Sequence, residues 1–413
     1  MKTFLVRGIS LALGGALFLG PAHADPGKAR TLVAQGIRQA SSNADAALAS
    51  FNQAADEDSS LAAAHYNQGV ILERRGRYAE AEAAYKKAVA DKPDHYASIE
   101  NLANLALRQK QTDKAEKILL DGIRSYPADL GLRNRLIAVW LAGDKVKEAE
   151  DEAKKILKAD ERNVGALVNL ATVFFRRKQL ELATSVLTRA RDIDPNEAKV
   201  WINLGFVYLA GDDKTAAAEA FKKATELRSD LPEALNNLGA LNNEARDYEG
   251  AIVALNQALA LYPTFGKAYL NLGNALKGAK RYAEAEQAYK KSLELDPDNP
   301  DTLFNLGILH IDNELPGVDR LGRFDVAKEF LTRYTQSRGP TPAEVEQAKV
   351  YIADAEKTKT TEERRIRAEE RRKQRQAAQP KPAEGAAKPE EKPAEPGAQK
   401  PAEPTPAEPG GKK

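Results

Sequence analysis

Seven asparagines recur along the chain at a fixed interval. Successive members lie 34 residues apart, except for one interval of 68 in which Arg135 takes the intermediate place. The row consists of Asn67, Asn101, Asn169, Asn203, Asn237, Asn271 and Asn305. A side-chain amide both donates and accepts hydrogen bonds, so evenly spaced asparagines can pair with successive amides of an extended chain. The row therefore points to recognition of a peptide backbone.

Catalytic chemistry has no comparable pattern. The chain lacks cysteine, which excludes thiol catalysis and disulfides. Its four histidines, His23, His65, His95 and His310, do not have metal-ligand spacing. No nucleophile elbow or phosphate-binding glycine loop is present. The sequence predicts a protein that is not an enzyme and that needs no cofactor or metal.

A segment around 312–322 contains several oxygen-bearing side chains, including Asp312, Asn313, Glu314 and Asp319. A calcium loop needs more ligands at closer spacing than these four supply. We interpret the segment as a longer turn between helices.

Alanine shows the same period as asparagine. It occurs at Ala47, Ala81, Ala115, Ala149, Ala183, Ala217, Ala251 and Ala285, and again at Ala327 after a longer interval. Repeat units therefore start at residues 28, 62, 96, 130, 164, 198, 232, 266 and 300. The eighth place of a unit is usually small, as in Gly205, and place 32 is often proline, which cannot continue a helix. A period of 34 residues indicates a helix–turn–helix array in which each unit packs only on its neighbours.

The stretches Trp201–Gly205 and Arg281–Ala285 resemble the tetratricopeptide repeat family nearly in full, with Tyr208, Tyr289 and Pro297 in matching places. The resemblance implies an all-α, right-handed superhelical solenoid of about nine repeats over residues 25–339. It further implies that the first helix of each unit lines a concave groove and that the asparagine place points into it. The first unit departs most from the pattern and is expected to act as an end cap.

The asparagine row is similar to the asparagine ladder in the repeat domain of O-linked N-acetylglucosamine transferase. Asparagine is also a frequent choice at this place in members that bind no peptide, so both interpretations stay open. Apolar residues at other groove-facing places favour binding: Val168, Phe175, Ile202, Phe206, Leu209 and Phe304. The family's carboxylate clamp needs a lysine where this chain has Glu100 or Leu270, so we do not expect that mode.

Residues 1–24 have the features of a secretory signal peptide. Lys2 and Arg7 precede an apolar run, and the triplet Ala22–Ala24 precedes the expected cleavage before Asp25. Without a cysteine the mature chain cannot carry the lipid of a bacterial lipoprotein. The expected location is the periplasm, with secretion as the alternative, and no integral membrane segment is expected after cleavage.

The C-terminal part contains two further segments. Residues 340–378 predict a capping helix that continues into a basic helix, with a net charge of +5 over residues 364–375. That helix is expected either to contact acidic surfaces, phosphate-rich polymers or, together with the tail, the cell wall, or to be a solvated extension. Residues 379–413 contain nine prolines and no large apolar side chain, which predicts a disordered Pro/Ala/Glu/Lys-rich tail.

These patterns together predict a non-enzymatic protein-interaction scaffold of the bacterial cell envelope. Its partners are expected to be envelope proteins that place an extended or helical segment in the groove, with no role for nucleic acid. An exported, cysteine-free array with such a tail also resembles periplasmic repeat subunits of envelope-spanning machines such as myxobacterial gliding motility complexes. The alternative is an accessory subunit of an exopolysaccharide export or cell-wall enzyme complex.

Overall fold

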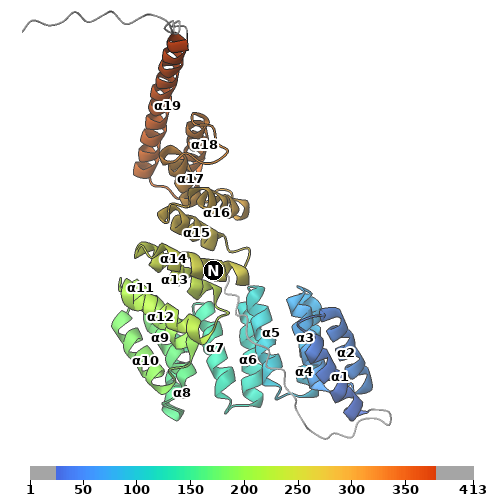
Figure 1. Cartoon of the computed structure of the whole chain (residues 1–413). Coiled ribbons are helices and arrows are strands. Elements are labelled where there is room, and N and C mark those ends of the chain that lie inside the picture. The colour runs from blue at the N-terminus through green and yellow to red at the C-terminus, as the bar shows by residue number, and fades with distance from the viewer. Residues whose placement is uncertain (1–24, 378–413) are drawn as a thin grey trace, which may run out of the picture. The chain divides into compact units, whose positions relative to one another are not determined.

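The computed structural model describes residues 25–377, in which every regular element is a helix (Figure 1). The first helices of the repeats are α1 (Pro26–Gln39), α3 (Ala62–Arg74), α5 (Tyr96–Arg108), α7 (Leu130–Ala142), α9 (Val164–Arg176), α11 (Ala198–Ala210), α13 (Pro232–Glu244), α15 (Gly266–Gly278) and α17 (Pro300–Asp312). The second helices are α2 (Ala44–Glu57), α4 (Tyr78–Asp91), α6 (Thr112–Ser125), α8 (Val146–Ala159), α10 (Leu180–Ile193), α12 (Lys214–Leu227), α14 (Tyr248–Leu261), α16 (Tyr282–Leu295) and α18 (Gly322–Gln336). A long helix, α19 (Pro342–Ala377), follows them. The predicted signal peptide, 1–24, and tail, 379–413, lie outside the described residues.

The helices pack with their neighbours in the sequence. Each second helix contacts the first helix of its own pair and the first helix of the next pair, from α1 through α18. This arrangement confirms the predicted all-α array of nine helix pairs. The contacts divide the chain into two units, of which the first ends at Ala355 and the second begins at Glu356, within α19.

The recurring small and large residues form the core of each pair. All nine of the periodic alanines, from Ala47 to Ala327, are fully buried. The small residue of the first helix lies against the large residue of the second: a Cβ atom added to Gly69 would lie 2.5 Å from the ring of Tyr85, and one on Gly273 would lie 2.4 Å from Tyr289. Only a residue without a side chain fits such a crossing.

The first repeat differs from the predicted register. The residue that lies against Phe51 is Gly36, one position later than the period places it, and a Cβ there would meet the ring at 2.5 Å. The first helix is therefore shifted by one residue relative to α2, so the unit that begins at residue 28 departs from the fixed 34-residue register within its first helix. This shift explains why Thr31 and Gln35 do not match the repeat pattern.

The turn inside most pairs uses a residue in the left-handed backbone region. Gly76 has φ of 73° there, whereas the later repeats use Lys110, Asp144, Lys178, Asp212, Arg246 and Lys280, with φ between 59° and 64°. A residue with a side chain pays about 1–2 kcal/mol in this region. The tight helical turn is thus kept at some cost in stability.

The ninth repeat carries the longer turn that the sequence predicts, between Asp312 and Gly322. Gly317 supplies a positive φ of 80° within it. No group of three or more acidic, histidine or cysteine side chains that could hold a metal occurs in residues 25–377.

Helix α19 begins with a reciprocal capping arrangement. The backbone amide of Thr341 donates to the Glu344 carboxylate at 2.7 Å, and the amide of Glu344 donates to the Thr341 hydroxyl at 3.3 Å. Further along, Ala348 is fully buried and the ring of Tyr351 meets that of Phe304 edge-on at 5.8 Å. The start of α19 therefore covers the end of the array.

None of the helices in 25–377 has an apolar stretch long enough to cross a bilayer.

Candidate functional site

The asparagine row divides into buried and half-buried members. Asn67 and Asn169 are 0% and 4% exposed, so their amides are enclosed by the protein. The half-buried members are Asn101, Asn203, Asn237, Asn271 and Asn305. Only this second group can offer its side-chain atoms to a partner without rearrangement.

Two members of the row bond to their own helices. The amide nitrogen of Asn67 donates to the Ala63 carbonyl at 2.8 Å, and that of Asn203 donates to the Lys199 carbonyl at 2.7 Å. Asn237 makes no hydrogen bond to any other residue of the described range through its side chain. The side chains of Asn203 and Asn237 therefore form no hydrogen bond to a neighbouring repeat within the described residues.

Other members connect consecutive first helices. Asn271 donates to the Asn236 side-chain oxygen at 2.9 Å, and Asn305 donates to that of Asn274 at 3.0 Å. Asn236 precedes Asn237 directly, and Asn274 lies one turn after Asn271 on α15, so two separate amide bonds connect α13 to α15 and α15 to α17. We call Asn236, Asn237, Asn271, Asn274 and Asn305 the amide row.

The sequence pattern did not identify all of these residues. Asn236 and Asn274 lie outside the periodic place, as does Asn134, which accepts from Asn169 at 3.2 Å through its side chain. Asn274 lies three residues after the periodic place and so shares a helix face with it, but Asn134 and Asn236 lie one residue before that place, about 100° around the helix, where the spacing gives no signal. Tyr289 strengthens the arrangement by donating its hydroxyl to Asn274 at 2.7 Å.

Arg135 replaces asparagine in the fourth repeat because it has a different partner. Its guanidinium pairs with the carboxylate of Glu100 on α5, and Glu100 is only 5% exposed. A buried carboxylate needs such a partner to remain charged. Since Glu100 is paired and Leu270 is buried, the two places that a carboxylate clamp would use are occupied by other contacts.

A second polar contact in the same region ties α3, α4 and α5 together. The hydroxyl of Tyr85 donates to Glu73 at 2.8 Å and accepts from Asn101 at 3.3 Å. Burial, and then the nearby Glu73 carboxylate, raise the pKa of Tyr85 far above its usual value. Asn101 therefore helps to satisfy a buried hydroxyl that stays protonated.

Four of the apolar side chains expected in the groove remain partly accessible, and they lie on α9 and α11. Ile202, Phe206 and Leu209 follow one another at spacings of four and three residues, which places them on one face of α11. Leu209 is 37% exposed, and the others are half-buried, including Phe175 on the adjacent α9. We call Phe175, Ile202, Phe206 and Leu209 the apolar patch.

The two other apolar residues expected in the groove belong to the core or are covered. Val168 is 1% exposed. Phe304 lies between Tyr334 of α18, whose ring is tilted against it at 5.2 Å, and Tyr351 of α19, which meets it edge-on at 5.8 Å. The accessible apolar surface is thus narrower than the sequence indicated.

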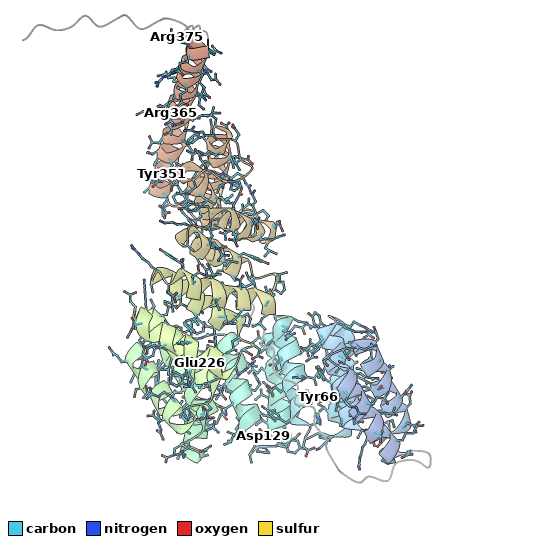
Figure 2. All side chains as sticks on the ribbon, viewed as in Figure 1. Tyr66, Asp129, Glu226, Tyr351, Arg365 and Arg375 are labelled. Carbon is cyan, nitrogen blue, oxygen red and sulfur yellow. The ribbon has the colours of Figure 1, made fainter. Side chains whose placement is uncertain are left out.

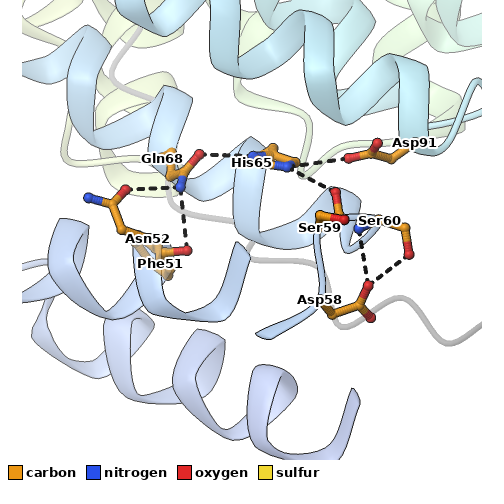
Figure 3. A network of polar contacts seen from close by, with 8 residues as sticks. All are labelled: Phe51, Asn52, Asp58, Ser59, Ser60, His65, Gln68 and Asp91. Carbon is orange, nitrogen blue, oxygen red and sulfur yellow. Dashed lines mark hydrogen bonds and ion pairs between the residues drawn. The ribbon is translucent and has the colours of Figure 1, made fainter. Parts of the chain in front are cut away.

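His65 lies in a network of polar contacts with acidic residues and serines nearby, the residue types of a catalytic triad (Figure 3). Its ring nitrogens contact the Gln68 side chain at 3.0 Å and the Ser59 carbonyl at 3.3 Å, and Asp91 lies 3.6 Å away. Ser59 contributes a carbonyl to His65, and the Ser60 hydroxyl donates to Asp58 instead. This network has no nucleophile beside its histidine, so it links the first two repeats structurally and lacks the geometry of a catalytic triad.

His310 is the other fully enclosed histidine of interest. It is 0% exposed, with Glu286 3.3 Å from its Nε2 atom and the ring of Phe330 stacked at 6.1 Å. Burial lowers the pKa of His310. This histidine is therefore neutral at physiological pH and contributes to packing.

Comparison with known families agrees with this architecture. Sequence profiles described as Tetratricopeptide repeat match residues 37–96, 72–139, 141–198, 202–264, 266–299 and 288–325. Together these matches cover most of the nine helix pairs.

Among individual proteins, the chain is 31% identical over 134 residues to Protein O-mannosyl-transferase Tmtc3 of Drosophila melanogaster. The match spans 32% of this chain but only 14% of that protein. Among solved structures, it is similar to the APC/C hetero-tetramer Cut9-Hcn1, with a TM-score of 0.51 and 18% identity over 79% of this chain and 67% of the other. YrrB, a TPR protein with an unusual peptide-binding site, is 20% identical and covers 48% of this chain and 97% of its own, with a TM-score of 0.42. The first of these structures supports the fold.

Proposed function

Because this chain belongs to the tetratricopeptide repeat family, we propose that it is a non-enzymatic scaffold that binds extended segments of partner proteins along its first helices. Repeats of this kind are protein-interaction arrays whose surfaces, not pockets, carry function. The amide row and the apolar patch are the parts of that surface with the chemistry to hold a peptide.

The amide row supplies backbone recognition. Asn271 and Asn305 each use one N–H for the next asparagine, which leaves a carbonyl oxygen and a second N–H on each side chain. Asn237 contributes a complete amide. Because the bonds between asparagines fix the orientation of the Asn271 and Asn305 side chains before a partner arrives, little of their side-chain entropy is lost on binding. This preorganised series is the observation that carries the proposal.

The apolar patch supplies the anchoring contact. Phe206 is held by an edge-on contact with the buried ring of Phe221 at 5.2 Å, which fixes the position of its half-buried ring. Rigid, partly exposed aromatic residues contribute a large share of binding free energy at protein interfaces. The expected partner is an extended segment with two features. A large apolar side chain would contact the apolar patch, and an adjoining stretch with uncharged side chains would place its backbone amides along the amide row.

We place this scaffold in the bacterial cell envelope, as a periplasmic protein, on the signal-peptide features of residues 1–24. Within the envelope, a subunit of a motility or other envelope-spanning machine is the role we favour. An accessory subunit of an exopolysaccharide export or cell-wall enzyme complex is the second candidate. Cell fractionation and N-terminal sequencing test the location: the protein should appear in the periplasmic fraction and begin at Asp25, and an intact precursor in the cytosol would contradict it.

Binding is tested with peptides selected from a displayed library on residues 25–377. Phe206→Ala and Asn237→Ala should each weaken the best peptides by roughly 5- to 30-fold, as expected for the loss of a central contact. Lys222→Ala, on the exposed side of second helix α12, is the control and should leave the affinity unchanged. Peptides that bind all three variants equally would place the binding surface elsewhere.

A further inference from the structure

The second unit contains an arginine-rich face that the peptide-binding proposal does not use. Seven basic and two acidic residues lie from Arg364 to Arg375, all of them exposed on α19. Figure 2 labels Arg365 and Arg375 on this helix. The sequence Glu-Glu-Arg-Arg begins at Glu362 and again at Glu369, seven residues later. Because residues seven apart lie within about 20° of each other around a helix, the repetition keeps like charges on the same face.

Helix geometry gathers four of the arginines on one side of α19. Arg364, Arg367, Arg371 and Arg375 fall within an arc of about 80°, over about 16 Å of helix length. Glu362 and Glu369 lie on the opposite side of the helix, whereas Glu363 and Glu370 lie about 80–100° from the centre of the arc and border it on one edge. We call these four arginines the arginine face.

The arginine face is largely free of internal neutralisation. Arg365, beside the face, contacts Glu362 and Glu369, both at 3.4 Å, whereas Arg367 reaches Glu363 only at 3.9 Å. Within the described part of the chain, Arg364, Arg371 and Arg375 form no ion pair. Unpaired arginines in a straight line make a strong, localised positive potential.

We propose that the arginine face binds a linear, phosphate-bearing polymer. A guanidinium presents two parallel N–H groups that match a phosphate, and this stretch has six arginines and one lysine. A straight row of cations along one face fits successive charges of a linear chain. Glu362 and Glu369 point away from it, and Glu363 and Glu370 border it on one edge, which limits contact to this face.

Two other occupants fit less well. Insertion into a lipid surface requires an apolar helix face, but Ile366 is the one large apolar side chain between Glu356 and Ala377, and it lies on the glutamate side. Pairing with a second copy of the helix would bring together two segments with a net charge of +5 over residues 364–375, without apolar residues at heptad positions.

The test uses the mature chain, residues 25–413, and inorganic polyphosphate as the probe. The variant R364Q/R371Q/R375Q keeps good helix formers and should weaken binding at least about tenfold in 0.1 M salt. The slope of log K against log salt should become shallower by about two. The control K110Q/K178Q/K280Q removes the same charge from the turns of the array and should change affinity less than about twofold.

Three results would overturn the proposal: equal loss in both triple variants, equal affinity for polyglutamate of matched charge, or binding to anionic phospholipid vesicles in preference to polyphosphate. Circular dichroism of both variants ensures that lost binding does not reflect lost helix. Asn237→Ala should bind polyphosphate normally, so this test is independent of the peptide-binding proposal.

Discussion

The side-chain amide of Asn271 donates a hydrogen bond to the oxygen of Asn236, one repeat earlier, across 2.9 Å. Asn236 is 2% exposed, so this bond satisfies a buried acceptor while its donor stays half-buried. One residue thus contributes both to the packing of α13 on α15 and to the surface that we assign to binding. Other asparagines at the periodic place, such as Asn203, bond only within their own helix and do not contribute to packing between repeats.

Asn271→Ala should therefore lower the free energy of unfolding by about 1–3 kcal/mol, because it leaves the Asn236 oxygen buried without a partner. Asn203→Ala should be neutral or stabilising by a few tenths of a kcal/mol, since its amide bonds only to its own helix and alanine is the better helix former. Urea titration of both variants measures the difference. Equal effects would mean that the bond between repeats contributes nothing specific.

Replacing a left-handed turn residue by glycine should stabilise the array. Lys178 has φ of 59° and is exposed, so Lys178→Gly removes a steric cost of about 1–2 kcal/mol and adds roughly 0.5–1 kcal/mol of backbone entropy cost. A net gain of about 0.5 kcal/mol is expected in the melting analysis. The reverse change, Gly76→Lys, should destabilise by a similar amount, and a gain there would refute the strain argument.

The close helix crossing in the eighth repeat predicts a large penalty for a single methyl group. Gly273→Ala would bring its Cβ within 2.4 Å of the Tyr289 ring, which is fully buried and cannot move aside, so a loss of about 1–3 kcal/mol is expected. Gly266→Ala, on the same helix, meets nothing closer than 3.6 Å and should be tolerated. Thermal melts that fail to separate the two substitutions would contradict the packing described here.

Acid should weaken the end of the array through His310. Its pKa is lowered by burial, so the unfolded chain takes up a proton near pH 6.5 before the folded protein does. The stability that neutral His310 provides is present above pH 6.5 and is lost as the pH falls toward its lowered folded-state pKa. His310→Gln should flatten this part of the stability–pH curve between pH 7.5 and pH 5.5, whereas an unchanged slope would assign the effect to other groups.

Most of the fold could be predicted because every repeat contains the same local information. The periodic alanines and glycines mark helix crossings, and each crossing involves only residues within one pair or the next. The one-residue shift at Gly36 escaped prediction because it depends on which residue meets Phe51, and a fixed period cannot report a contact of that kind.

The candidate site could be predicted only in part. The periodic place located Asn237, Asn271 and Asn305, but burial depends on the neighbouring repeat, which is why Asn67 and Asn169 are enclosed. Asn236 and Asn274 accept hydrogen bonds because of the way consecutive first helices pack on each other. Phe304 is covered by residues of α18 and α19. Contacts between side chains of different repeats cannot be read from the spacing along one chain.

The most direct test of the peptide-binding account is site-specific photo-crosslinking of the full-length chain in intact cells. A photoreactive amino acid at Phe206 or Asn237 should crosslink to the same partner protein, while one at Lys222 or Glu226 on second helix α12 should not. Figure 2 labels Glu226. Mass spectrometry of the adducts should find a single extended segment of the partner against both first-helix positions. Crosslinks that form only from α12, with none from Phe206 or Asn237, would contradict the account.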